Sequence, residues 1–127
     1  MGGDLHAERR AGWGRIVNVG SAAGVVSFKG MGAYGATKEA IRSLTRTAAR
    51  EWAQDGIVVN LYCPVSVGHH SGTTTMIDEF SSAGMAVVAA LSPYGLDGDA
   101  RNDLGPTVAF LLSDDCRYLT GQTLMLD

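Results

Sequence analysis

The sequence predicts an α/β fold, a parallel sheet of about three strands with flanking helices. Three short apolar runs are bounded by glycine, proline or aspartate and lack strict alternation, as strands covered on both faces do; they span residues 15–19, 57–62 and 123–126. Helical patterns lie between these runs, and this alternation is typical of parallel connections. Because 127 residues are enough for one domain and no more, we expect residues 1–127 to form a single domain.

The first predicted strand, residues 15–19, leads through Gly20 into Ser21. Ligands of open parallel sheets bind beyond the carboxyl ends of the strands, which is where this serine falls. The small residues 22–24 leave room around its hydroxyl. Residues 1–14 could supply only the tail of a helix, so the strand would keep one unpaired edge. Since three strands also make a small sheet, we expect this sheet to be part of a larger one.

A long helix is predicted between the first two strands, from about residue 33 to residue 54. Its apolar residues recur at three- and four-residue spacing, which predicts one buried face made of Ile41, Leu44, Ala48 and Trp52. Gly56 stands just beyond the expected end, where a glycine commonly terminates a helix.

The part of the sequence after the second strand is rich in glycine, serine and threonine over residues 66–75. Short helices are expected at about residues 76–82 and 85–91. A further helix is expected at about residues 103–112, where Leu104, Val108 and either Leu111 or Leu112 would share a face. The last strand, residues 123–126, follows it.

Charge and hydropathy exclude two classes of protein. The net charge is −3 and the ten lysines and arginines are scattered apart from the pair Arg9–Arg10, so no basic footprint for nucleic acid is present. The longest apolar stretch, residues 85–91, is far shorter than the roughly 20 residues of a membrane span. No charged segment followed by an apolar one opens the sequence as a secretory signal would.

The two cysteines, Cys63 and Cys116, have neither metal-binding nor redox spacing. We interpret them as buried thiols of a cytoplasmic protein rather than as a disulfide. His69 and His70 are adjacent, and neighbouring residues do not face one another on a helix, so they suggest a solvated loop rather than a metal site. No metal is expected.

Tyr34 and Lys38 are the first candidates for chemistry. Four residues apart on a helix, they lie on one face and can act on the same small volume. A phenol is a poor base at neutral pH, but a nearby ammonium favours its ionised form, so the pair could move a proton to or from a substrate hydroxyl. The alternative is a core aromatic residue followed by a solvated lysine. Ser21, thirteen residues before Tyr34, would bring a hydroxyl to the same end of the sheet.

Together these segments resemble the active-site region of the short-chain dehydrogenase/reductase family, in its branch of shorter enzymes. The resemblance is carried by GRIVNVGS at residues 14–21, YGATK at 34–38 and VVNLYCP at 58–64. The family's final helix and strand resemble FLLSD at residues 110–114 and YLTGQTLMLD at 118–127. The likeness therefore runs from about residue 14 to residue 127.

The resemblance implies an oxidoreductase that transfers a hydride between NAD or NADP and a small-molecule alcohol or ketone. Tyr34 would be the general acid/base, and Lys38 would assist it and bind the nicotinamide ribose. Ser21 would hold the substrate oxygen. The turn from Pro64 to Val67 would contact the nicotinamide, and this part of the sequence departs from the family at Val65, where glycine is usual, and at His69, where threonine is common.

The family's fold is a Rossmann-like, doubly wound parallel sheet that opens with a strand, a glycine-rich turn and a helix facing the pyrophosphate. No segment here resembles them. We therefore expect the sequence to correspond to the C-terminal, catalytic part, with the N-terminal βαβ cofactor half missing and the pocket incomplete. We expect this truncated chain to be inactive alone.

Two alternatives remain open. The chain could be a non-enzymatic pseudoenzyme or interaction fragment, since family members are commonly dimers or tetramers and it could pair with itself or with a full-length relative. Alternatively, residues 30–35 fit the pattern G-x-G-x-x-G of a nucleotide-binding domain, with Asp55 twenty residues after Gly35. Against this second alternative, Asp55 precedes a strand instead of following one, and no convincing strand leads into Gly30.

Overall fold

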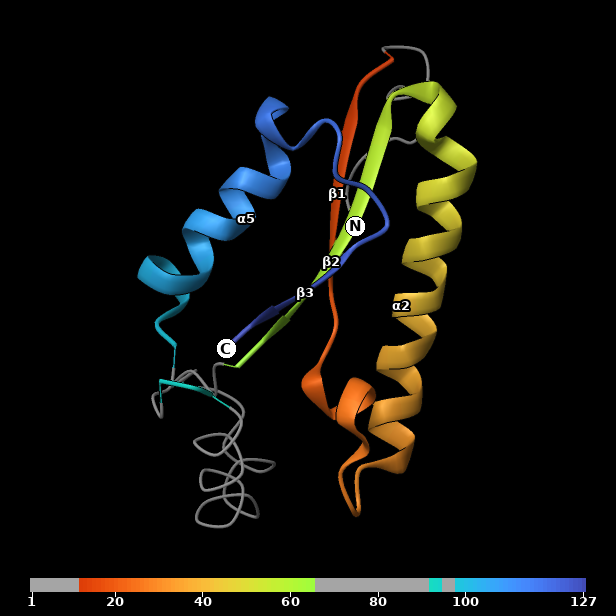
Figure 1. The fold of residues 1–127 in the computed structure, drawn as a ribbon. Coiled ribbons are helices and arrows are strands. Elements are labelled where there is room, and N and C mark those ends of the chain that lie inside the picture. Colours follow the sequence, from red (N-terminus) through yellow and green to blue (C-terminus); the bar gives the residue numbers. More distant parts are fainter. Residues whose placement is uncertain (1–11, 66–91, 95–97) are drawn as a thin grey trace.

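The computed structural model describes residues 12–65, 92–94 and 98–127 (Figure 1). Its sheet has three parallel strands in the order β1-β2-β3, which are Gly14–Val19, Ile57–Pro64 and Thr123–Leu126. All three were predicted, and the second runs two residues further than expected. The α/β class and the parallel sheet are therefore confirmed.

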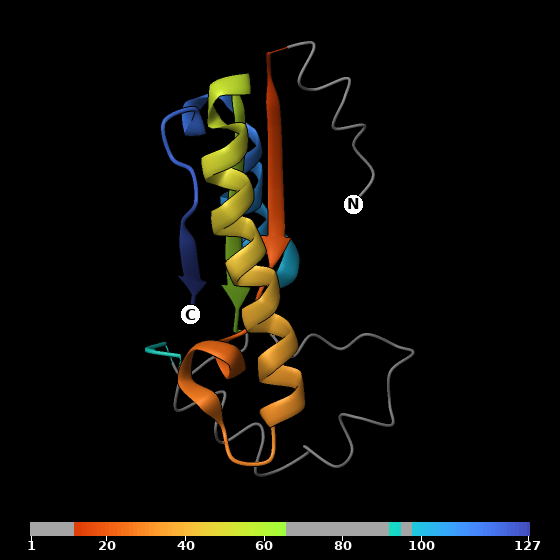
Figure 2. The same cartoon turned by 90° about the vertical axis from the view of Figure 1, so that its right-hand side faces the viewer.

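Helices cover the two faces of this sheet. Helix α2, Gly32–Trp52, lies against one face and helix α5, Gly105–Leu112, against the other (Figures 1 and 2). The central strand β2 serves both faces, because Val59 joins Ala49 in one apolar cluster while its neighbour Val58 joins Leu111 in the other. This double burial explains why β2 is apolar without alternation.

The buried face of α2 differs from the predicted one. Leu44, expected in the core, has 68% of its surface exposed, whereas the adjacent Thr45 is 1% exposed. The sheet-facing stripe follows Thr45, Ala48 and Ala49 and reaches Trp52. At 3.6 residues per turn Leu44 lies about 100° away from Thr45, so the prediction for Leu44 was wrong. A threonine carries no apolar signal, and this hid the true stripe.

The end of α2 is close to the expected place. A short 3₁₀ turn, Ala53–Asp55, continues the helix, and Gly56 then adopts a left-handed conformation with φ of 74°. Its backbone N–H donates to the Ala53 carbonyl at 3.0 Å. Gly56 thus ends the helix as the sequence indicated.

Helix α5 begins with a π-helical turn, Ala100–Leu104, a few residues earlier than predicted. Asp99 caps this turn by accepting the Asn102 backbone N–H at 2.7 Å. Leu111 is buried and Leu112 is exposed, which decides between the two candidates for the core face. The segment 66–75 and the short helices expected at 76–82 and 85–91 lie outside the described residues.

Strand β3 is joined to β2 by the side chain of Asn60, which is fully buried. Its amide nitrogen donates to the Leu119 carbonyl at 2.6 Å, and its amide oxygen accepts the Gln122 backbone N–H at 3.0 Å. One side chain therefore holds both ends of the turn that leads into β3. Among the described residues, no helix has the length and apolarity that crossing a bilayer requires.

Candidate active site

Ser21 lies directly beyond the carboxyl end of β1. The Gly20 backbone N–H donates to the Tyr62 carbonyl at 2.8 Å, so the chain stays hydrogen-bonded to β2 for one residue beyond the end of β1. A Cβ at Gly20 would lie 2.5 Å from Leu61 Cδ2 and 2.8 Å from Cys63 Sγ, so this passage requires glycine. The Ser21 hydroxyl accepts the Ala23 backbone N–H at 3.1 Å, which leaves its hydrogen free to donate.

The first turns of α2 pack closely against the loop that follows Ser21. A Cβ at Gly24 would lie 2.9 Å from Glu39 Oε1, and one at Gly35 would lie 3.1 Å from the Ala23 carbonyl oxygen. Glycine at both positions lets the helix approach the loop backbone. This close approach accounts for Gly24 and Gly35.

Tyr34 and Lys38 share a face of α2, as their spacing predicts. Lys38 Nζ lies 5.7 Å from the centroid of the Tyr34 ring and donates a hydrogen bond to the Val19 carbonyl at 3.3 Å. Tyr34 is 45% exposed, so its hydroxyl is open to a ligand. The ammonium and the phenol ring thus lie together beside the end of β1.

Pro64 and Val67 were the other predicted cofactor contacts. Pro64 is the last residue of β2 and is paired with Leu126. The next residue, Val65, is buried and its backbone N–H donates to the Leu126 carbonyl at 2.9 Å. Val67 lies outside the described residues, as do His69 and His70. No group of three metal-binding side chains occurs within the described ranges.

A half-buried ion pair behind the Ser21 loop was missed in the sequence. Arg42 Nε donates to both carboxylate oxygens of Glu39, at 2.9 and 2.8 Å. This hydrogen bonding raises the pKa of Arg42. Opposite charges three residues apart on a predicted helix were the available signal.

The two cysteines are buried free thiols, as predicted. Burial raises the pKa of Cys63 above its ordinary value of 9.0, although the positive charge of Arg42 opposes the shift. Burial also raises the pKa of Cys116, against the opposing effect of Arg15. Both side chains are therefore neutral near pH 7 and pack as small apolar groups.

The raised pKa values of Cys63 and Cys116 predict that the fold loses stability at alkaline pH. Below the ordinary thiol pKa both folded and unfolded chains hold the protons, and the stabilisation is fully present. As the pH rises above about 9 the unfolded chain ionises first, so the free energy of unfolding falls until the folded thiols ionise too. In urea unfolding between about pH 7 and 10, the free energy of unfolding of the double variant Cys63→Ala/Cys116→Ala should fall less steeply with pH than that of the parent chain. Equal slopes in this variant and the parent chain would contradict the prediction.

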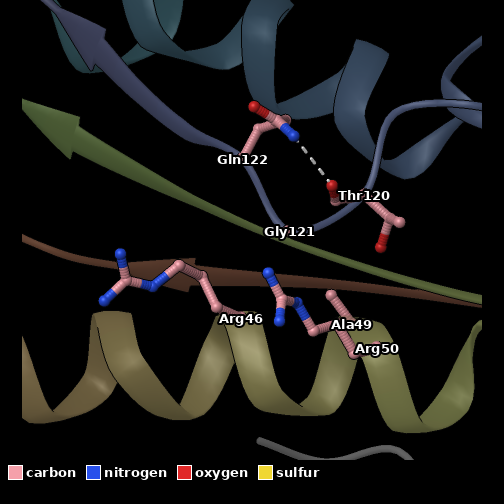
Figure 3. A pocket seen from close by; sticks show the side chains of 6 residues that line it. All are labelled: Arg46, Ala49, Arg50, Thr120, Gly121 and Gln122. Atoms are coloured by element: carbon pink, nitrogen blue, oxygen red, sulfur yellow. Dashed lines mark hydrogen bonds between the residues drawn. The ribbon is translucent and has the colours of Figure 1, made fainter.

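Two hollows lie along the C-terminal half of α2, at the other end of the sheet. One of about 240 Å³ is lined by Arg46, Ala49 and Arg50 together with residues 120–122, and Figure 3 shows both arginines beside this turn. The other, of about 300 Å³, shares Arg46 and Arg50. Neither is lined by Ser21, Tyr34 or Lys38.

The nucleotide-binding pattern at residues 30–35 has no matching structure. The segment before Gly30 is a π-helical turn, Ala23–Ser27, and not a strand. Asp55 lies at the amino end of β2, away from the edge where a ribose would bind. The glycines instead allow the loop to turn into α2, and Gly30 has φ of 83°.

Known proteins resemble nearly all of the chain. A family model described as enoyl-(acyl carrier protein) reductase matches residues 5–127. Senescence-associated protein 13 of Arabidopsis thaliana is 38% identical over 119 residues, which is 94% of this chain and 42% of the relative. The (S)-acetoin-forming diacetyl reductase of Staphylococcus epidermidis is 37% identical over 120 residues, 90% of this chain and 47% of the relative.

A solved structure agrees with these relatives. A putative NAD(P)-dependent gluconate 5-dehydrogenase from Beutenbergia cavernae, with bound NADP, has a TM-score of 0.76 at 34% identity, over 96% of this chain and 47% of that one. The chain spans less than half the length of the curated relatives it matches. Over that span, the chain belongs to the short-chain dehydrogenase/reductase family.

Proposed function

We propose that the chain carries the catalytic residues of an NAD(P)-dependent oxidoreductase that interconverts a small-molecule ketone and its alcohol. The observation that carries this proposal is the position of Lys38 Nζ, which lies between the Val19 carbonyl and the ring of Tyr34. Hydroxyl, phenol and ammonium groups beside the carboxyl end of a parallel strand suit proton transfer to a substrate oxygen.

In the direction of reduction, the Tyr34 hydroxyl gives its proton to the substrate oxygen. Lys38 stabilises the negative charge that then develops on the tyrosine oxygen, because its ammonium lies against the ring. The hydroxyl of Ser21 accepts from Ala23 and so has its own hydrogen free to donate to the same substrate oxygen. Oxidation of an alcohol uses the same groups in reverse.

The residues present fit the nicotinamide end of the cofactor. Lys38 uses one N–H on the Val19 carbonyl, and no described residue accepts from the other two, which could bind ribose hydroxyls. Tyr34 and Lys38, with Pro64 and Val67, would hold this end of NAD or NADP, and the cofactor when bound supplies the hydride. In the described ranges, no strand–glycine turn–helix unit suits the pyrophosphate.

Association with a second chain is the alternative role. Among the described residues β1 pairs only with β2, so its other edge is open for pairing. A homo-oligomer or a complex with a longer relative would cover this edge. Gel filtration of the purified chain, alone and mixed with such a relative, measures this association directly.

Titration with NADH and NADPH tests the proposed activity. Energy transfer from Trp13 and Trp52 to the dihydronicotinamide would report binding, and loss of its absorbance with diacetyl would report turnover. Saturable binding that is lost in Lys38→Ala and kept in Lys29→Ala supports the proposal. A folded chain that binds a cofactor equally well in Lys38→Ala contradicts it. A folded chain that binds neither cofactor is the inactive fragment expected from the incomplete pocket, and it leaves the association role.

A further inference from the structure

The contact between α2 and β1 is made largely by small apolar groups. Ala49 is buried in an apolar cluster with Ile57 and Val59 of β2, and Ile16, Ala48 and Trp52 pack against this cluster. Apolar packing is non-directional, so hydrogen bonds supply the directional part of the contact between α2 and β1. In the described part of the chain two hydrogen bonds join these elements, one from Lys38 to the Val19 carbonyl and one from Asn18 to Thr45.

The second of these bonds is buried at the helix. Asn18 Nδ2 donates to Thr45 Oγ1 at 2.9 Å, and Thr45 Oγ1 in turn donates to the Ile41 carbonyl at 2.8 Å. Thr45 is almost completely buried, so its hydroxyl has no access to water. The strand is thereby tied to the backbone of α2 itself, through a short and stiff side chain.

On the strand, the two hydrogen bonds involve the consecutive residues Asn18 and Val19. On the helix, their partners lie about two turns apart. Lys38 and Thr45 are separated by seven residues, or about 10 Å along the axis, and so share a face. Lys38 has a flexible four-carbon stem that cannot fix the helix alone. The Asn18–Thr45 bond supplies the fixed point from which Lys38 reaches the Val19 carbonyl.

We propose that Asn18 and Thr45 are positioning residues, whose hydrogen bond holds α2 in the register that places Lys38 between Val19 and Tyr34. The catalytic meaning of this register rests on the proposed function, since Lys38 and Tyr34 are its proposed catalytic residues. The geometric claim concerns Lys38 alone and can be measured without turnover.

The sequence holds only two lysines, Lys29 and Lys38, which gives an internal standard. Lys29 is exposed, whereas Lys38 is half-buried and hydrogen-bonded. Brief acetylation with acetic anhydride, followed by mass spectrometry, yields the ratio of the two rates. In Thr45→Val, which keeps the shape and removes the hydroxyl, we expect the Lys38/Lys29 ratio to rise roughly fivefold, the factor typical of one lost hydrogen bond. Thr45→Ser should restore the original ratio.

A matched variant separates positioning from general destabilisation. Cys116→Ala creates a cavity on the α5 side of the sheet and lowers stability, but it leaves the α2–β1 contact intact. Its Lys38/Lys29 ratio should equal that of the parent chain. An unchanged ratio in Thr45→Val, or an equal rise in Cys116→Ala, would overturn the proposal.

Turnover then distinguishes this inference from the proposed function. If the parent chain reduces diacetyl, Thr45→Val should lower kcat roughly tenfold with KM changed less than twofold, and Thr45→Ser should recover kcat. A raised acetylation ratio in a chain without turnover supports the positioning role of Asn18 and Thr45, and it shows that the proposed activity is absent from the isolated chain. If the parent chain is active and its Thr45→Val variant keeps both kcat and the acetylation ratio, the positioning role is contradicted and the proposed function is not.

Discussion

Tyr34→Phe should lower the turnover of a carbonyl substrate by about 10²- to 10⁴-fold, the usual contribution of a general acid or base. The variant removes one hydroxyl and keeps the ring that lies near Lys38. Since that hydroxyl makes no hydrogen bond to any described residue and the side chain is half exposed, the fold should be unaffected. Steady-state loss of NADH or NADPH absorbance measures turnover, and thermal unfolding by circular dichroism checks the fold.

Tyr118→Phe is the matched control for this experiment. Tyr118 is fully exposed and follows the turn Asp114–Cys116, on the far side of the sheet from α2. The same chemical change there should leave turnover as it was. Retained turnover in Tyr34→Phe, or an equal loss in both variants, would show that Tyr34 does not transfer the proton.

The strands could be predicted because each is a short apolar run bounded by glycine, proline or aspartate. In β2 five consecutive residues, 57–61, are buried and four of them are apolar, so a nearly continuous apolar run is the direct result of the fold. The buried face of helix α2 is harder to predict, because it contains a threonine and an exposed leucine lies beside it. Apolar spacing alone assigned Leu44 to the core, and only the partner side chain, Asn18, explains why Thr45 replaces it.

In the candidate site, too, some features could be predicted from the sequence and others could not. Tyr34 and Lys38 could be brought together from sequence because residues four apart on a helix share a face. The acceptor of Lys38 could not be predicted, since it is a backbone carbonyl and every residue has one. The Asn18–Thr45 bond joins residues 27 apart and depends on how the helix lies on the strand, which no local pattern encodes.

The sequence at the start of the α5 region contains a helix-start signal. Asp99 and Asp103 bracket the first turn, where Asp99 accepts the Asn102 N–H and Asp103 accepts the Asp99 N–H, each at 2.7 Å. This reciprocal capping is recognisable as two short acceptors around a helix start. The two aspartates thus indicate a helix that begins near residue 100.

The largest effect on stability is expected from Asn60→Leu. Leucine has a similar volume, so the core stays filled, but the Leu119 carbonyl and the Gln122 N–H both lose their buried partner. An unsatisfied buried group costs about 1–3 kcal/mol, so the loss of both partners should lower the free energy of unfolding by about 2–6 kcal/mol. Urea unfolding followed by fluorescence of Trp13 and Trp52 measures it.

Two further variants show whether the amide or the site itself is responsible. Asn102→Leu changes an exposed asparagine whose side chain has no described partner, and it should alter the free energy of unfolding by less than about 0.5 kcal/mol. Asn60→Asp keeps an acceptor for Gln122 but cannot donate to Leu119 and buries a charge, so it should be as damaging as leucine. If Asn60→Asp were as stable as the parent chain, the bond to Leu119 would not hold the turn, and β3 would owe its place to the apolar contacts of Leu119 and Leu124.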